Sequence, residues 1–266
     1  MIRSPGFILH AIVLLALYAA GCDLLESDSE VYQTAHAARA EFHFTLPERG
    51  IDRLEIEAVN GPIAITAAAP DSAPGVSGER MVSSNSREDA RNHLEELEVR
   101  CLTLGRTVLL QTRQPRETSG RSYIVSYKVR IPSSWSLGVD LVNGLVTIDS
   151  MRSKTDVQLV NGDVALRGLS GDVTAHMVNG SVLGSVILPP QGRLVLETVN
   201  GAISLALPRS TSAQFGANVE NGRIHFSELP LQDIRSNKKA LYGRLGEGEG
   251  TIALKSVNGS ILVQGY

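Results

Sequence analysis

The run of glycines between Gly243 and Gly250 is the segment that most resembles a phosphate-binding loop. A Walker-type loop places a lysine and then a serine or threonine after its last glycine, and it connects a strand to a helix. Here residues 251–254 (Thr-Ile-Ala-Leu) alternate as in a strand, and the next lysine is Lys255. We therefore interpret the segment as a turn and expect no bound cofactor.

Candidate metal ligands and catalytic carboxylates are scattered along the chain. The six histidines show no i,i+4 pair and no spacing with cysteine that is typical of zinc sites. Aspartates that recur near turns, and that could bind calcium if stacked, are Asp149, Asp156, Asp163 and Asp172. Other copies have Ser181, Ala202 or Ser260 near the turn, so no acidic ladder is predicted. Because the Gly-x-Ser-x-Gly motif is absent and no carboxylate cluster can be assembled, we predict no metal site and no catalytic residue.

Cys22 is the one residue whose surroundings indicate a specific modification. Arg3 precedes an apolar stretch at positions 7–20, which is shorter than the ~20 residues that cross a bilayer as a helix. The stretch ends in Ala-Ala-Gly before Cys22, as at the cleavage site of a signal peptide. A cysteine there resembles the lipobox of bacterial lipoproteins, whose thiol is acylated before cleavage. This predicts a signal peptide over 1–21 and a lipid anchor on Cys22. The alternative is an ordinary signal peptide cut near Ala20, with Cys22 incidental.

Composition excludes several classes of ligand. A formal net charge of −3 provides no basic surface for nucleic acid. Aromatic residues make up 5% of the chain, with Trp135 the single tryptophan, so stacking platforms for bases or sugars are few. Cys101 has no partner once Cys22 is acylated, so no disulfide framework is predicted. The apolar neighbours of Cys101 indicate a buried thiol rather than a nucleophile.

An internal repeat organises the rest of the chain. Seven copies of an Asn-Gly pair are each followed, two residues after the glycine, by Val or Ile. The pairs are Asn60-Gly61, Asn143-Gly144, Asn161-Gly162, Asn179-Gly180, Asn200-Gly201, Asn221-Gly222 and Asn258-Gly259. Asparagine and glycine accept positive φ at low cost, so an Asn-Gly pair indicates a tight turn. Apolar residues alternate on both sides of each pair, as in strands with one buried face. We therefore predict structural turns at all seven pairs.

The spacing of the copies allows two architectures. Successive asparagines from Asn143 to Asn221 are 18, 18, 21 and 21 residues apart, with a second turn signal between copies. Such a period suits one rung of a single-domain β-solenoid, which resembles a parallel β-helix. It also suits an antiparallel β meander or sandwich with Asn-Gly hairpins. The 37 residues between Asn221 and Asn258 are either two rungs or one rung with an insertion at 227–248.

The segments outside the regular repeat are predicted as follows. Residues 22–38 are polar and form a tether. Ser86 opens a capping box, which predicts a short helix at 87–97. Strands are expected at 102–112 and 123–131, joined by a basic, polar segment (113–122) that we interpret as a solvated hairpin tip.

The repeats, the helix and the strand at 125–131 (Val-Ser-Tyr-Lys-Val-Arg-Ile) together resemble the bacterial putative-adhesin domain family. This family consists of β-solenoid surface proteins of unknown function, and the resemblance implies one such domain over 39–266. It carries over no catalytic residue. We expect an all-β, non-enzymatic lipoprotein that is anchored in the cell envelope by its lipid and acts as an adhesin-like binding or structural module. An envelope protein or a glycan is the expected ligand. The alternatives are a polysaccharide-active enzyme on a β-helix and an accessory component of an envelope-stress response.

Overall fold

The computed structural model describes residues 36–69 and 72–266. The predicted signal peptide, Cys22 and most of the predicted tether lie outside these residues. Strand β1 (His36–Thr45) begins inside the segment expected as the tether, slightly before the expected start of the domain at residue 39.

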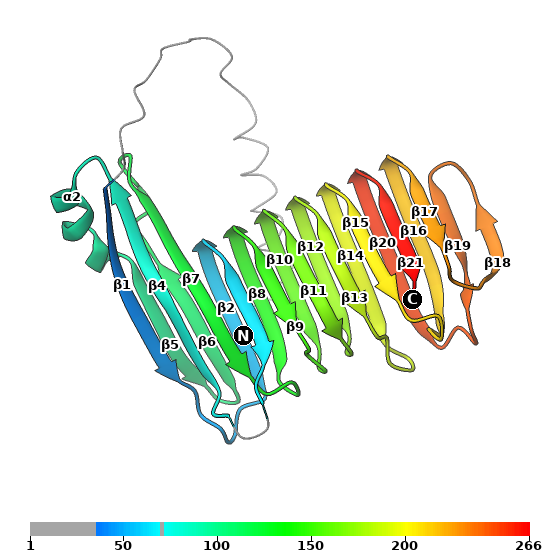
Figure 1. The fold of residues 1–266 in the computed structure, drawn as a ribbon, viewed down its shortest axis with the longest axis horizontal. Coiled ribbons are helices and arrows are strands. Elements are labelled where there is room, and N and C mark those ends of the chain that lie inside the picture. Colours follow the sequence, from blue (N-terminus) through cyan, green and yellow to red (C-terminus); the bar gives the residue numbers. More distant parts are fainter. Residues whose placement is uncertain (1–35, 70–71) are drawn as a thin grey trace, which may run out of the picture.

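The described strands form two large sheets that enclose one elongated core (Figure 1). In spatial order, the 11-stranded sheet consists of β18 (Leu231–Ser236), β19 (Ala240–Leu245), β16 (Ala213–Asn221), β20 (Gly250–Asn258), β14 (Arg193–Asn200), β12 (Val173–Asn179), β10 (Thr155–Asn161), β8 (Ser136–Asn143), β2 (Arg53–Asn60), β6 (Thr107–Arg113) and β5 (Glu98–Leu104). The 10-stranded sheet consists of β1, β4 (Gly75–Ser84), β7 (Ser122–Ile131), β3 (Ile63–Ala67), β9 (Val146–Asp149), β11 (Val164–Leu169), β13 (Val182–Val186), β15 (Ile203–Leu207), β21 (Ile261–Gly265) and β17 (Ile224–Ser227).

Each Asn-Gly copy connects a strand of the 11-stranded sheet to a strand of the 10-stranded sheet, as β10 is followed by β11. Neighbouring rungs pair in parallel and in register, so that Ala165 lies opposite Thr147 and Asn161 lies opposite Asn143. The β-solenoid prediction is confirmed. The meander alternative is wrong for the repeats, because an Asn-Gly hairpin would keep both of its strands in one sheet.

The asparagines of the seven copies form one continuous ladder along the corner between the sheets. Each side-chain Nδ2 donates to the Oδ1 of the preceding asparagine, over distances of 2.6 to 2.8 Å. The ladder runs in the order Asn60, Asn143, Asn161, Asn179, Asn200, Asn258, Asn221. At its start, Asn60 donates to the carbonyl oxygen of Tyr123 at 3.1 Å. The ladder therefore provides hydrogen-bond partners for the side-chain amides of the asparagines at this corner.

The glycine after each asparagine allows the rungs to approach one another. Gly180 has a φ of 138°, and a Cβ at this position would lie 1.7 Å from the carbonyl oxygen of Gly162. Gly222 and Gly259 lie outside the positive-φ set, yet a Cβ at either would lie 2.0 or 1.9 Å from a backbone oxygen of the next rung. Close stacking, more than positive φ, is therefore the common reason for glycine at these corners.

The order of the last rungs in space differs from their order in the sequence. Strands β20 and β21 lie between the β14–β15 rung and the β16–β17 rung, pairing in parallel with both. The interval between Asn221 and Asn258 contains β18 and β19, which form an antiparallel end to the 11-stranded sheet. The interval is thus one rung with an insertion, and the final rung is placed between two earlier ones.

Antiparallel strands and a short helix form the other end of the solenoid. Strands β1, β4 and β7 pair antiparallel, as do β5 and β6. Helix α2 (Arg87–Asn92) begins after Ser86, whose Oγ accepts from the Asp89 N–H at 3.1 Å, as the capping box predicts. A 3₁₀ turn, Leu94–Glu96, follows it. The predicted helix at 87–97 therefore consists of two shorter segments, with His93 between them.

Two expectations for this end are wrong. A turn at Gly105, with a φ of 63°, divides the predicted strand at 102–112 into β5 and β6. The segment 113–122 is not a hairpin tip, because β6 and β7 belong to different sheets. The alternating strand expected at 123–131 is confirmed in β7, where every second side chain from Tyr123 to Ile131 is buried.

Alternation directs one side of each strand into the shared core. In β10, Val157 and Leu159 are buried, while Asp156 and Gln158 lie on the outer face. Full burial of an aliphatic side chain contributes ~1.5–3 kcal/mol, so the inward positions fix the register of every rung. The outward positions are consequently stacked in straight rows, whatever residues occupy them.

Candidate functional site

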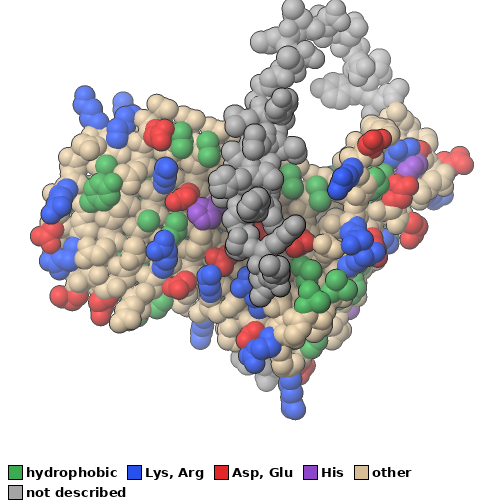
Figure 2. Space-filling view, turned by 180° about the vertical axis from the view of Figure 1, so that it is seen from behind, with side chains coloured by type: hydrophobic (Ala, Val, Ile, Leu, Met, Phe, Trp, Pro, Cys, Tyr) green, Lys and Arg blue, Asp and Glu red, His purple; other side chains and the backbone are tan. Residues whose placement is uncertain are grey.

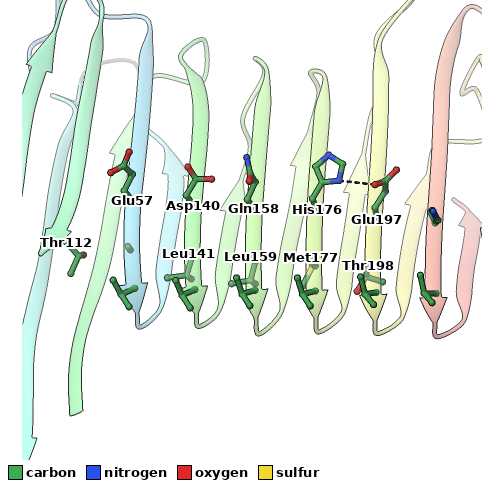
Figure 3. Close-up of a pocket in the computed structure, with 18 of the residues that line it drawn as sticks. Glu57, Thr112, Asp140, Leu141, Gln158, Leu159, His176, Met177, Glu197 and Thr198 are labelled. Atoms are coloured by element: carbon green, nitrogen blue, oxygen red, sulfur yellow. Dashed lines mark hydrogen bonds and ion pairs between the residues drawn. The ribbon is translucent and has the colours of Figure 1, made fainter. Parts of the chain in front are cut away.

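A row of polar side chains crosses the outer face of the 11-stranded sheet (Figure 3). In six of the seven repeats it is the residue three positions before the asparagine, and parallel pairing places these residues opposite one another. The seventh such residue, Asn218, lies opposite Lys255 outside the set. Strand β6 adds one further member opposite Glu57. The polar row, in spatial order, is Gln111, Glu57, Asp140, Gln158, His176, Glu197 and Lys255.

An apolar row lies beside the polar row, nearer the corner. It consists of the residue directly before the asparagine in six of the seven copies, the exception being Glu220, and we call it the valine row: Val59, Val142, Val160, Val178, Val199 and Val257. The two rows border a groove of about 480 Å³. Buried residues between the rows, such as Leu141, Leu159 and Met177, complete its lining. The groove is thus polar along one side and aliphatic along the other.

Asp140 is the electrostatically unusual member of the polar row. Desolvation, followed by the charges of Glu57 and Glu55, raises the pKa of Asp140 to about 6. Asp156 acts in the same direction, and Arg53 opposes it. The side chain still reaches solvent, so the desolvation is confined to its side against the sheet. The Asp140 carboxylate therefore carries a negative charge that its surroundings disfavour.

The other half of the polar row has its charges paired. His176 Nδ1 lies 3.1 Å from Glu197 Oε2, and Lys255 is opposite Glu197 on the next strand. On the near side, Gln111 donates to Glu57 at 2.8 Å. No hydrogen bond or ion pair formed within residues 36–69 and 72–266 involves the Asp140 carboxylate.

This groove was not predicted from the sequence, and the prediction that no carboxylates come together is wrong. The register places Glu57 and Asp140 side by side on adjacent strands. The two residues are 83 positions apart, because the segment containing β4 to β7 separates the first two rungs. The available signal was the position three before each asparagine, which is polar in all seven copies.

Of the four aspartates considered as calcium ligands, Asp149 and Asp156 form ion pairs with Arg167 and Lys154, and the other two form hydrogen bonds to neighbouring rungs. Asp163 accepts from the Ser181 N–H, and Asp172 accepts from the Arg193 N–H, each at 2.8 Å. Within the described part of the chain, no group of three or more His, Cys, Asp or Glu residues could hold a metal ion. Asp163 and Asp172 therefore bind backbone N–H groups of the solenoid.

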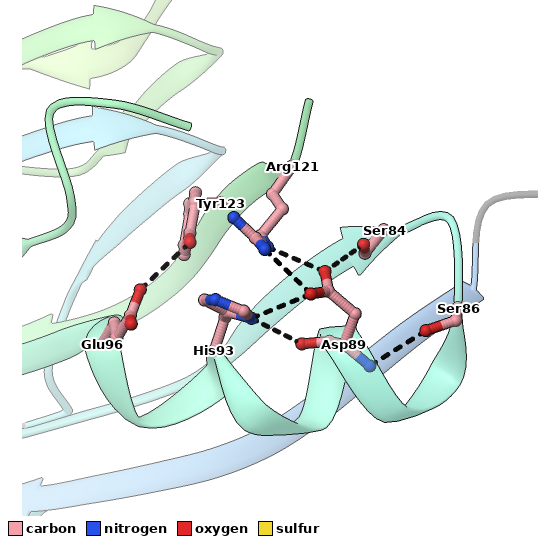
Figure 4. A network of polar contacts seen from close by, with 7 residues as sticks. All are labelled: Ser84, Ser86, Asp89, His93, Glu96, Arg121 and Tyr123. Atoms are coloured by element: carbon pink, nitrogen blue, oxygen red, sulfur yellow. Dashed lines mark hydrogen bonds and ion pairs between the residues drawn. The ribbon is translucent and has the colours of Figure 1, made fainter. Parts of the chain in front are cut away.

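A second polar cluster surrounds Asp89 on helix α2 (Figure 4). Arg121 donates to both Asp89 carboxylate oxygens at 2.7 and 2.8 Å, and Ser84 donates to the same carboxylate. These bonds hold the pKa of Asp89 well below its usual range. Ser84 is hydrogen-bonded to the carboxylate and not to His93, so the cluster lacks the serine–histidine contact of a nucleophilic triad. It attaches the helix to the 10-stranded sheet.

The glycine-rich segment and Cys101, the remaining candidates from the sequence, lie in parts of the fold with a structural role. The glycine-rich segment forms the turn from β19 to β20, with a φ of 53° at Gly246 and 74° at Gly248. Cys101, expected to be buried, is only half-buried on the edge strand β5, and burial raises the pKa of its thiol. Neither location gathers groups that could catalyse a reaction.

On the part of the surface that Figure 2 leaves uncovered, basic and acidic side chains are interspersed. Within the residues that the structure covers, no helix is both long and apolar enough to span a bilayer.

The stacked rungs and their corner ladder define a two-sheet β-solenoid. The chain belongs to the Toastrack DUF4097 family, whose model matches residues 35–264. This match confirms the family resemblance inferred from the repeats. No curated protein matches the chain.

Several solved structures resemble the fold at low sequence identity. A putative cell adhesion protein from Clostridium sporogenes is 12% identical, with a TM-score of 0.48, covering 86% of this chain and all of its own. A putative adhesin from Bacteroides fragilis is 9% identical, with a TM-score of 0.28 and coverage of 85% and 97%. A putative lipid binding protein from Parabacteroides distasonis is 11% identical, with a TM-score of 0.32 and coverage of 88% and 98%.

Proposed function

We propose that the protein is a non-enzymatic lipoprotein of the cell envelope whose 11-stranded sheet binds an extended ligand in the groove. The groove is the observation that carries the binding role. It offers hydrogen-bonding side chains and an aliphatic strip in two parallel rows, which is the composition of a site that orients a ligand with a few polar groups. The sequence around Cys22 supports attachment to a membrane, with the ligand either an envelope protein or a glycan.

The binding role can be tested with two matched variants. Val199, 38% exposed, belongs to the valine row, whereas Leu183, 60% exposed, lies on the outer face of the other sheet. Ligands captured by the full-length protein on peptide and glycan arrays should be lost with Val199→Asp and retained with Leu183→Asp. Equal retention by both variants, with unchanged melting temperatures, would exclude the groove as the binding site.

The lipid anchor can be tested by metabolic labelling with a palmitate analogue. Wild type should be labelled, while Cys22→Ala should remain unlabelled because the acylated thiol is absent. Equal labelling of both proteins would contradict the lipoprotein assignment.

A second candidate function is favoured by the carboxylate pair. A general acid with a pKa near 6, next to a second carboxylate, is the arrangement that glycosidases use. The lining residues of the groove include no aromatic side chain that could stack on a sugar, which favours binding over hydrolysis. Reducing-sugar release from common polysaccharides, abolished by Asp140→Asn, would establish the enzyme instead.

A further inference from the structure

The two halves of the groove differ in how their charges are balanced. In the half formed by β12, β14 and β20, His176 and Lys255 flank Glu197. In the half formed by β6, β2, β8 and β10, the polar row contains two carboxylates and no cation: Gln111, Glu57, Asp140 and Gln158. The second half is therefore anionic.

Two of the three basic residues near the anionic half are paired with other carboxylates, and the third, Arg113, donates from Nε to Gln111 Oε1 at 3.4 Å. Arg53 Nε donates to Glu55 at 2.8 Å, and Lys154 Nζ lies 3.0 Å from Asp156. The groups that act on Asp140 from its own and adjacent strands are thus Glu57, Glu55 and Asp156, opposed by Arg53. A cation brought by a ligand would relieve the repulsion that Arg53 offsets only in part, since no basic side chain of the described chain forms an ion pair with Asp140.

The length and chemistry of the groove fit an extended peptide. It crosses seven strands, which at ~4.8 Å between strands is about 29 Å, or roughly nine residues of extended chain. Gln158 provides both a donor and an acceptor for backbone amide groups, and the valine row provides aliphatic contact area. The protein's own tether is an unsuitable occupant, because positions 22–35 contain only acidic charges, at Asp23, Glu26, Asp28 and Glu30.

Resting on the proposed function, we infer that the ligand of the groove is an extended, basic polypeptide segment. A Lys or Arg side chain of this segment lies between Glu57 and Asp140, and its aliphatic side chains lie on the valine row. The interaction is charge-assisted on one side of the groove and hydrophobic on the other, so neither a basic nor an aliphatic peptide alone satisfies the site.

Fluorescence anisotropy with three labelled nonapeptides tests this inference on the full-length protein in detergent. The peptides alternate lysine with valine, glutamate with valine, or lysine with serine. The double variant Glu57→Gln/Asp140→Asn removes both charges of the anionic half. The control, Glu41→Gln/Glu79→Gln, changes two glutamates that lie opposite each other on the 10-stranded sheet.

We expect the lysine–valine peptide to bind most tightly, and the groove variant to weaken its binding about tenfold or more, as loss of a charged hydrogen bond does. The control variant should remain within about twofold of wild type. Lowering the pH from about 7.5 to about 5 should weaken binding to wild type and not to Asp140→Asn, since protonation removes the same charge. Equal binding of the glutamate–valine peptide, or an unchanged affinity in the groove variant, would overturn the inference.

A separate outcome distinguishes this inference from the proposed function. If no peptide binds but a glycan binds in a manner that Val199→Asp abolishes, the basic-peptide inference fails and the groove remains a binding site. If Val199→Asp affects no captured ligand, the proposed function itself fails.

Discussion

Replacing Gly180 by alanine tests how the rungs are held together. The added Cβ would lie 1.7 Å from the Gly162 carbonyl oxygen, so the two rungs must move apart by more than an ångström to reach ordinary contact. That movement breaks the bond from the Gly162 N–H to the Asn179 carbonyl (2.9 Å) and the Asn179–Asn161 side-chain bond (2.8 Å). Each contributes about 1 kcal/mol. Holding alanine at a φ of 138° costs a further ~1–3 kcal/mol, for a total of about 3–5 kcal/mol.

Gly105 provides the control, because it also has positive φ, at 63°, but no atom lies within 4 Å of its would-be Cβ. Gly105→Ala should therefore cost only ~1–2 kcal/mol, the strain of the backbone alone. Urea unfolding, followed by the fluorescence of Trp135, the single and deeply buried tryptophan, gives both free energies of unfolding. Equal losses in the two variants would refute the stacking argument and leave only backbone conformation to explain the repeated glycine.

Three further outcomes are expected. With Cys101→Ser as background, Thr147→Cys/Ala165→Cys should form an intramolecular disulfide under mild oxidation, because the two residues are opposite on adjacent parallel strands; failure to close in a folded protein would contradict the register. Asp140→Asn should raise the melting temperature near pH 7.5. The free energy of unfolding should rise by up to about 1 kcal/mol after allowance for solvent screening. The advantage of this variant should be lost as the pH falls from about 6 to below the ordinary carboxyl pKa of 3.8, because the raised folded-state pKa of Asp140 destabilises the protein only above that ordinary value; an undiminished advantage below that pH would contradict this. Asp89→Asn should lower the melting temperature at neutral pH, and the difference should shrink only below about pH 4, since the pKa of Asp89 is depressed in the folded protein; a pH-independent difference would show that the ion pair with its arginine is not the cause.

The sequence was sufficient to predict the rungs, because their signals are local. The Asn-Gly pair, the alternation around it and the spacing of 18 to 21 residues each lie within a single window of sequence. Parallel pairing was one of two possibilities, and the choice depends on whether a corner joins two sheets or one. Packing of the core between the two sheets decides this, and residues distant in the sequence contribute to that packing.

The groove could not be predicted with the same ease, because it depends on which rungs are neighbours. Glu57 becomes the neighbour of Asp140 only when β2 pairs with β8 across a long intervening segment. Likewise, Lys255 lies next to Glu197 only because β20 pairs with β14 instead of following β16. Once the order of the rungs is known, the row follows from the sequence alone except for Gln111, since every other member is three residues before its asparagine.

The placement of β20 and β21 between two earlier rungs constrains the order of assembly during synthesis. Most solenoid rungs can add to the growing stack as they emerge, but the β16–β17 rung has no parallel partner until residues 250–265 have been made. Its hydrophobic side chains, including Phe215 and Phe226, must remain unassembled over that interval. Completion of this end therefore requires a non-local closing step, which slows folding relative to sequential stacking. Residues 213–266, about a quarter of the described domain, are therefore the last part of the solenoid to assemble.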